Sequence, residues 1–160
     1  MEKVLRQEKK YLLNYLEAIN YSNVFGTILN GDPHNGNDGY IVRSLYFDTL
    51  DNKDFYLKEM GVELRRKVRL RIYNPDDDFA LLEMKQKQGD YQMKRSLRIS
   101  RKDALSLIKG DYDCLLKYKD DFVKECYSYM ISEGYRPVCV VQYNRKAFIC
   151  RENRIRITFD

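Results

Sequence analysis

The sequence predicts an α+β fold with a mostly antiparallel sheet, and three observations support this prediction. Predicted strands come first, helices follow, and strands close the chain. Gly89-Asp90 separates two strand-like segments as a two-residue hairpin would, which makes the two strands antiparallel. Charged and apolar residues also alternate along several strands, as they do in a sheet with one face on a core.

The first part of the chain alternates strand and helix signals. Leucine and isoleucine recur at helical spacing after an initial charged strand, and a run of Asn, Gly, Asp and Pro marks a loop. A β-branched and aromatic segment then predicts a strand, and a short helix follows that ends at Gly61. The predicted ranges are a strand at 3–11, a helix at 12–29, a loop at 30–39, a strand at 40–48 and a helix at 52–61.

The rest of the chain is predicted as three strands, a helical region and two further strands. The turn Asn74-Pro75-Asp76 ends the first strand, and Ser100 with Asp103 three residues later is a plausible helix N-cap. The count is about seven strands. The predicted ranges are strands at 62–73, 79–88 and 91–100, helices at 102–109 and 119–133, and strands at 136–151 and 154–160, with no clear preference around 110–117.

Length and composition exclude several classes of protein. The 160 residues suit one domain over 1–160, and 44% hydrophobic residues supply a core. No apolar run approaches the ~20 residues of a membrane span, and the charged N-terminus does not resemble a signal peptide. Four cysteines without a CxxC pair, and a single histidine, argue against structural zinc and for a reducing compartment. We therefore expect a cytoplasmic protein.

The net charge of +5 is concentrated in two blocks. Residues 62–101 hold 11 basic and 6 acidic side chains, and residues 136–160 hold 6 and 2. In the first block, Arg65, Lys67, Arg69 and Arg71 alternate with apolar residues, so one face of that strand carries a row of cations. If only one strand carried such a row, the solvent-exposed outer face of an amphipathic sheet would explain it. Several like-charged neighbouring strands repel one another, which predicts a bound polyanion, and arginine fits phosphate oxygens.

A set of motifs then occurs in a fixed order along the chain. They are RQEKKY at 6–11, YIVRSLYFDT at 40–49, Gly61-x-x-x-Arg65 followed by RRKVRLRIY, LLEMKQK at 81–87, YNRKAF at 143–148 and RIRITFD at 154–160. Together they resemble the polyphosphate polymerase domain of the vacuolar transporter chaperone (VTC) complex and its bacterial relatives. That family belongs to the triphosphate tunnel metalloenzymes, also called CYTH-like proteins.

The resemblance implies a curved antiparallel sheet that forms a tunnel-like β-barrel with helices outside. It implies phosphotransfer from ATP to polyphosphate with Mn2+ or Mg2+, and therefore ATP, triphosphate or inorganic polyphosphate as partners. Lys10, Arg69, Arg71 and Lys85 would be catalytic. The phosphate ligands carried over by motif are Lys10, Arg69, Arg71, Lys85, Lys94, Tyr143, Arg145 and Arg156.

The chain also departs from the family pattern. It stops at Asp160, so it would lack the family's last strands and their metal-binding glutamate, and the barrel would be incomplete. Only Glu8 and Lys10 match the E-x-E-x-K pattern of the first strand, which makes Glu8 the metal-ligand candidate. Glu83 fits either an internal salt bridge or metal ligation. His34 fits a surface residue or, with no visible partner, a general base.

Three functions stay open at this point. The chain is a polymerase, a triphosphate hydrolase, or a non-catalytic module that binds polyphosphate or nucleic acid. Nucleic acid is the less favoured partner, because Tyr40 and Tyr46 share one strand face and are better explained as packing residues than as base-stacking residues.

Overall fold

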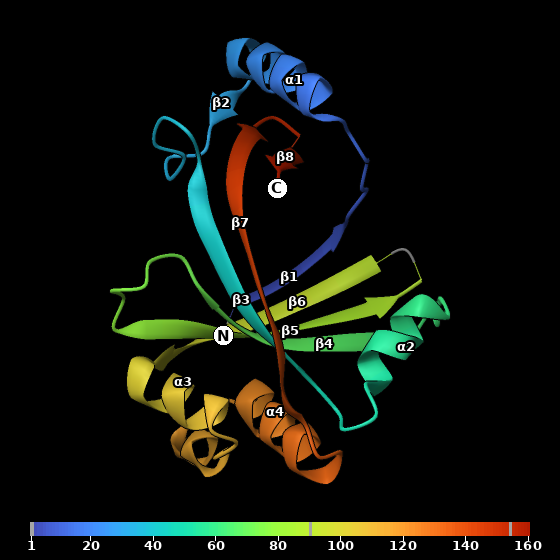
Figure 1. Cartoon of the computed structure of the whole chain (residues 1–160), viewed down its shortest axis with the longest axis vertical. Coiled ribbons are helices and arrows are strands. Elements are labelled where there is room, and N and C mark those ends of the chain that lie inside the picture. The colour runs from blue at the N-terminus through green and yellow to red at the C-terminus, as the bar shows by residue number, and fades with distance from the viewer. Residues whose placement is uncertain (1, 90, 154) are drawn as a thin grey trace. The chain divides into compact units, whose positions relative to one another are not determined.

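A computed structural model describes residues 2–89, 91–153 and 155–160 and confirms the α+β class with antiparallel strand pairing (Figure 1). The strands and helices alternate much as the sequence indicates. The helical elements are α1 (Tyr15–Ile28), α2 (Lys53–Glu59), α3 (Arg101–Ile108), the 3-10 helix η1 (Asp113–Lys117) and α4 (Asp121–Ser132). The strands are β1 (Glu2–Gln7), β2 (Asn30–Gly31), β3 (Tyr40–Asp48), β4 (Arg65–Ile72), β5 (Phe79–Gln88), β6 (Tyr91–Ser100), β7 (Arg136–Cys150) and β8 (Ile155–Phe159).

The chain divides into two compact units. The first combines the N-terminal segment up to Glu8 with Arg43–Val141, and the second combines Lys9–Val42 with Gln142–Asp160. Strands β3 and β7 each run from one unit into the other along the chain. A single domain over 1–160 stays a prediction.

The first unit is a sheet with helices packed on one face. Its strands follow the order β1-β6-β5-β4-β3, and each strand pairs antiparallel with its neighbours. Figure 1 shows α3 and α4 on the same side of β4, β5 and β6. The core lies between this face and the helices, because Val68, Leu82 and Ile99 of the sheet belong to one buried cluster with Leu107 and Phe122 of the helices.

Local sequence signals account for where the helices and turns of this unit begin and end. Ser100 accepts a hydrogen bond from the Asp103 backbone amide and caps α3, as the sequence predicts. Gly61 has a φ of +72° after α2, which fits its predicted role in ending that helix. The predicted hairpin turn includes Gly89, with a φ of +56°, and Asp90, which lies outside the described residues.

The second unit packs α1 on the end of β7. Phe25 of α1 contacts the rings of Phe148 and Phe159 on β7 and β8, with centroids 6.4 and 6.2 Å away. The short strand β2 and β8 both pair antiparallel with β7. Asn35 fixes the loop after β2, because its side chain donates to the Ala147 carbonyl and accepts from the Ala147 amide.

The main differences from the sequence prediction are local. The first strand ends at Gln7 instead of residue 11, and the two-residue β2 and the 3-10 helix η1 were not predicted. The sheet is open, which agrees with the incomplete barrel expected from the sequence. The strand order β1-β6-β5-β4-β3-β7-β2, with β8 beside β7, starts and ends on different strands, so the described strands do not close into a barrel. In the described part of the chain, no helix has the length and apolarity needed to cross a bilayer.

Candidate functional site

The sheet face opposite the core carries the predicted cations. In the register of β4, β5 and β6, Arg69 lies opposite Glu83, which in turn lies opposite Ser96, and Lys67 lies opposite Lys85. Because strand side chains alternate, these residues share one face while Val68, Leu70 and Met84 point into the core. We call the set Lys67, Arg69, Arg71, Lys85 and Lys94 the cationic face.

A fully buried carboxylate lies at the centre of the cationic face. Glu83 is 0% exposed and binds Arg69 through Nε–Oε2 and Nη2–Oε2 distances of 2.7 and 2.6 Å. Arg71 Nε lies 3.7 Å from the same oxygen, and Lys94 Nζ lies 3.4 Å from Oε1. Burial alone would raise the pKa of Glu83, but the charges of these three cations outweigh it and hold the pKa below its usual value.

The neighbouring strand β3 fixes the two arginines further. Arg69 Nη1 donates to the Tyr46 hydroxyl at 2.9 Å, and Arg71 Nε donates to the Ser44 hydroxyl at 3.1 Å. Both arginines are buried, at 5% and 6% exposure. Glu83 raises the pKa of Arg69 despite the opposing effect of burial. The guanidinium groups are therefore charged and held in place before any ligand arrives.

The two lysines of the cationic face are less buried. Lys85 Nζ lies 3.4 Å from Glu8 Oε2, and Lys94 Nζ lies 3.6 Å from Glu2 Oε2. Their side chains remain 24% and 20% exposed. Their contacts to carboxylates are longer than a good charged hydrogen bond, so an anion can compete for these ammonium groups.

The carboxylates present do not form a preassembled metal centre. Among the described residues, no three His, Cys, Asp or Glu side chains come together as potential ligands. Glu83 is committed to cations, and Glu8 contacts Lys85. The structure therefore favours the salt-bridge alternative for Glu83, and Glu8 as a metal ligand stays a prediction.

The second unit brings together the other predicted ligands except Lys10. Arg145 makes two hydrogen bonds of 2.5 Å to Asp160 and donates to the Tyr143 hydroxyl at 3.1 Å. Burial lowers the pKa of Arg145, but Asp160 raises it well above its usual value. Arg156 lies on β8. Its Nη2 is 2.5 Å from Asp32 Oδ2 and donates to the Tyr40 hydroxyl at 2.8 Å.

Three outcomes go beyond or against the sequence reading. Lys10 lies in the segment between β1 and α1 and is exposed. Tyr46 was interpreted only as a packing residue, yet its hydroxyl accepts a hydrogen bond from Arg69, and no signal in the sequence indicated this contact because it depends on the register between β3 and β4. His34, for which no partner was visible in the sequence, has its Nδ1 2.8 Å from Asp32 Oδ1.

Comparisons with known proteins find one matching family and two similar solved structures. A family model described as "VTC domain" matches residues 5–160. A solved structure from Bacillus halodurans, described as a "putative adenylate cyclase", has a TM-score of 0.52 at 14% identity, with 94% of this chain and 67% of that chain covered. A second, from Vibrio parahaemolyticus with the same description, has a TM-score of 0.49 at 14% identity, with 98% and 66% covered.

The chain thus spans about two thirds of the length of each of these structures. At this level of identity the likeness shows the fold alone. No curated protein sequence matches the chain significantly.

Proposed function

The chain belongs to the VTC domain family, and on that premise we propose that it binds the phosphates of triphosphate, polyphosphate or ATP on the cationic face. The observation that carries this proposal is the sharing of Glu83. Buried Glu83 lies within 4 Å of Arg69, Arg71 and Lys94, so it gathers three cations on one face of the sheet. A preorganised group of cations is what a phosphate chain requires.

The proposed reaction is phosphoryl transfer from ATP to polyphosphate. A terminal oxygen of polyphosphate forms a bond to the γ-phosphorus, the bond to the β–γ bridging oxygen breaks, and its electron pair leaves with ADP. Such a step depends on positioning and charge neutralisation more than on a protein nucleophile. Arg69, Arg71 and Lys85 would hold the phosphate oxygens, and Lys10 is proposed to join them.

The remaining predicted residues are part of the same proposal. Lys94, Tyr143, Arg145 and Arg156 would contact further phosphates of the chain. Glu8 is the candidate carboxylate that would hold Mn2+ or Mg2+, which would supply positive charge against the phosphates. A cytoplasmic location, where ATP is abundant, fits the proposal.

A binding module is the second candidate, and a specific observation favours it. The three carboxylates of this face, Glu2, Glu8 and Glu83, each contact a lysine or arginine of the face. These carboxylates orient the cations, and a module that binds phosphate without catalysis needs only such oriented cations. Polyphosphate is the favoured ligand of such a module, and nucleic acid the less favoured one.

Calorimetric titration with inorganic triphosphate tests binding. The chosen variant is Lys85→Gln with Lys94→Gln, since these side chains are the more exposed members of the face. We expect saturable binding that weakens about tenfold or more in the double variant, because two cation–phosphate contacts are lost. Lys124→Ala, on exposed α4 surface, is the charge control and should bind like the wild type. Equal binding by the wild type and the double variant would refute the proposal.

Incubation with ATP and Mn2+, followed by separation of products, tests the reaction. Ladders of phosphate chains indicate a polymerase, and phosphate released from triphosphate indicates a hydrolase. Binding without either product supports the binding module.

A further inference from the structure

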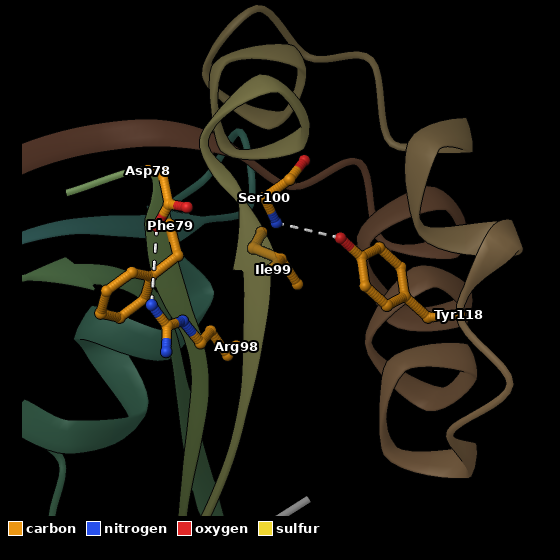
Figure 2. Close-up of a pocket in the computed structure, with 6 residues that line it drawn as sticks. All are labelled: Asp78, Phe79, Arg98, Ile99, Ser100 and Tyr118. Carbon is orange, nitrogen blue, oxygen red and sulfur yellow. Dashed lines mark hydrogen bonds and ion pairs between the residues drawn. The ribbon is translucent and has the colours of Figure 1, made fainter.

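A hollow of about 320 Å³ lies where β5 begins and β6 ends (Figure 2). It belongs entirely to the first unit. Figure 2 shows Phe79 and Arg98 on one side of the Ile99–Ser100 segment and Tyr118 on the other. The residues lining it are Asp78, Phe79, Arg98, Ile99, Ser100 and Tyr118.

Arg98 and Phe79 form a flat platform in this hollow. The Arg98 Cζ lies 3.3 Å from the centroid of the Phe79 ring, so the guanidinium rests on that ring. Asp78 Oδ1, 3.5 Å from Arg98 Nη2, holds the group from the side. The Arg98 side chain is nevertheless 63% exposed, which leaves the platform accessible to a planar ligand.

Tyr118 lines the hollow on the other side of the Ile99–Ser100 segment (Figure 2), and its ring is held in position. Its hydroxyl accepts a hydrogen bond of 3.1 Å from the Ser100 amide and donates one of 2.5 Å to Asp103. Asp103 is itself buried, at 3% exposure. The ring is therefore held in place by the α3 N-terminus and does not need a ligand to position it.

The strand register places the Arg98 and Phe79 side of this hollow on the same face of the sheet as the cationic face. Leu81 lies opposite both Arg71 and Arg98, so Arg98 belongs to the same side of the sheet as Arg71. Phe79 points to that side as well, two residues beyond Leu81 and four beyond Glu83. At about 3.4 Å per residue these steps are about 7 and 14 Å, which is the range over which an extended nucleoside triphosphate separates its base from its phosphates.

We propose that the hollow holds the base of a nucleoside triphosphate whose phosphates lie on the cationic face. The base would stack on the guanidinium plane of Arg98, as bases do on arginine and aromatic side chains. The Asp78 carboxylate, which only accepts hydrogen bonds, would receive an amino group of the base. This inference rests on the proposed function and adds a preference for nucleotide over bare triphosphate.

The test compares two ligands by titration calorimetry in EDTA, so that metal affinity does not differ between them. The ligands are ATP and inorganic triphosphate. Arg98→Lys keeps the charge and removes the plane. We expect it to raise the ATP-to-triphosphate ratio of dissociation constants about five- to tenfold, the size of one lost stacking contact. Phe79→Leu, which removes the ring below the guanidinium, should change the ratio in the same direction, and Lys124→Ala should leave it unchanged.

The possible outcomes separate the inference from the proposed function. If Arg98→Lys and Phe79→Leu leave the ratio as in the wild type, the hollow does not bind the base and the inference is wrong, although phosphate binding stands. If both ligands weaken equally, Arg98 acts on phosphate or on the fold, which also refutes the base site. If the wild type binds neither ligand, the proposed function itself fails.

Discussion

Neighbouring residues of β6 place cations on opposite faces of one sheet, and their partners differ. Arg95 points to the core side and forms an ion pair with Glu125, with hydrogen bonds of 2.5 and 2.7 Å to its two carboxylate oxygens. Lys94 points to the other side and shares Glu83 with Arg69 and Arg71. The Arg95–Glu125 pair lies on the core side and stabilises the fold, whereas the cations gathered around Glu83 lie on the face proposed to bind phosphate.

Removal of the shared carboxylate should have the largest effect. Glu83→Gln removes the buried carboxylate that lies next to the buried Arg69 and Arg71, and we expect a loss of about 3–5 kcal/mol in the free energy of unfolding. Triphosphate should restore more stability to this variant than to the wild type, because it replaces the missing negative charge. Thermal unfolding with and without triphosphate measures both effects. An equal shift in both proteins would contradict the idea that Glu83 and phosphate interact with the same cations.

A second buried carboxylate sharpens the comparison. Asp54 is 4% exposed and its closest partner is the Tyr135 hydroxyl at 2.7 Å. Burial raises its pKa to about 6, whereas the cations around Glu83 lower the pKa of that group. Because the folded state holds a proton that the unfolded state has lost between about pH 4 and pH 6, stability falls as the pH rises through that window.

Asp54→Asn tests this pH dependence. The wild type should lose about 2–3 kcal/mol across the window, at roughly 1.4 kcal/mol per pKa unit, while the variant should lose less. Urea unfolding at a series of pH values measures the slope. Identical slopes for both proteins would assign the pH dependence to other groups.

Loss of the Arg95–Glu125 ion pair should affect stability but not triphosphate binding. Arg95→Gln removes two charged hydrogen bonds to Glu125, and we expect a loss of about 2 kcal/mol in stability. Triphosphate affinity of the folded variant should stay within twofold of the wild type, because Arg95 faces the core side. Denaturant unfolding and calorimetry check the two parts, and a clear loss of affinity would show that the two faces are coupled.

The smallest effect is expected at Tyr46. Tyr46→Phe removes the hydrogen bond from Arg69 and keeps the ring, at a cost of about 1 kcal/mol in stability. A less restrained Arg69 should also weaken triphosphate binding by about two- to threefold, which titration at fixed salt would detect. Affinity equal to that of the wild type would show that Glu83 alone orients Arg69.

The strands could be predicted from the sequence because alternation fixes which side chains share a face. Residues 40–48, 79–88 and 91–100 were predicted with the bounds that β3, β5 and β6 have. The grouping of Arg69, Arg71, Lys85 and Lys94 was likewise predictable. The partners were not, because the register that brings Glu83 and Tyr46 to Arg69 depends on how β4 pairs with β5 and β3, which alternation within one strand does not specify.

The loop 30–39 was the least predictable segment. Its turn-forming composition indicated a loop, but nothing local showed that Asn35 would bond both backbone groups of Ala147, 112 residues away. The two-residue β2 has too few residues for a periodic signal, and η1 has a single turn. The roles of Lys10, Tyr143, Arg145 and Arg156 come from the family resemblance and stay predictions.

Gly39 in that loop has a consequence for mutational scanning. Its φ is +98°, and a Cβ there would overlap the carbonyl oxygen of Arg145 on β7. Any side chain at position 39 would have to push this backbone away and, with it, the arginine predicted to bind phosphate. A saturation scan scored by activity would therefore rank Gly39 beside the ligand residues, although glycine contributes no functional group. Sensitivity to substitution at this position would report how closely two backbones approach.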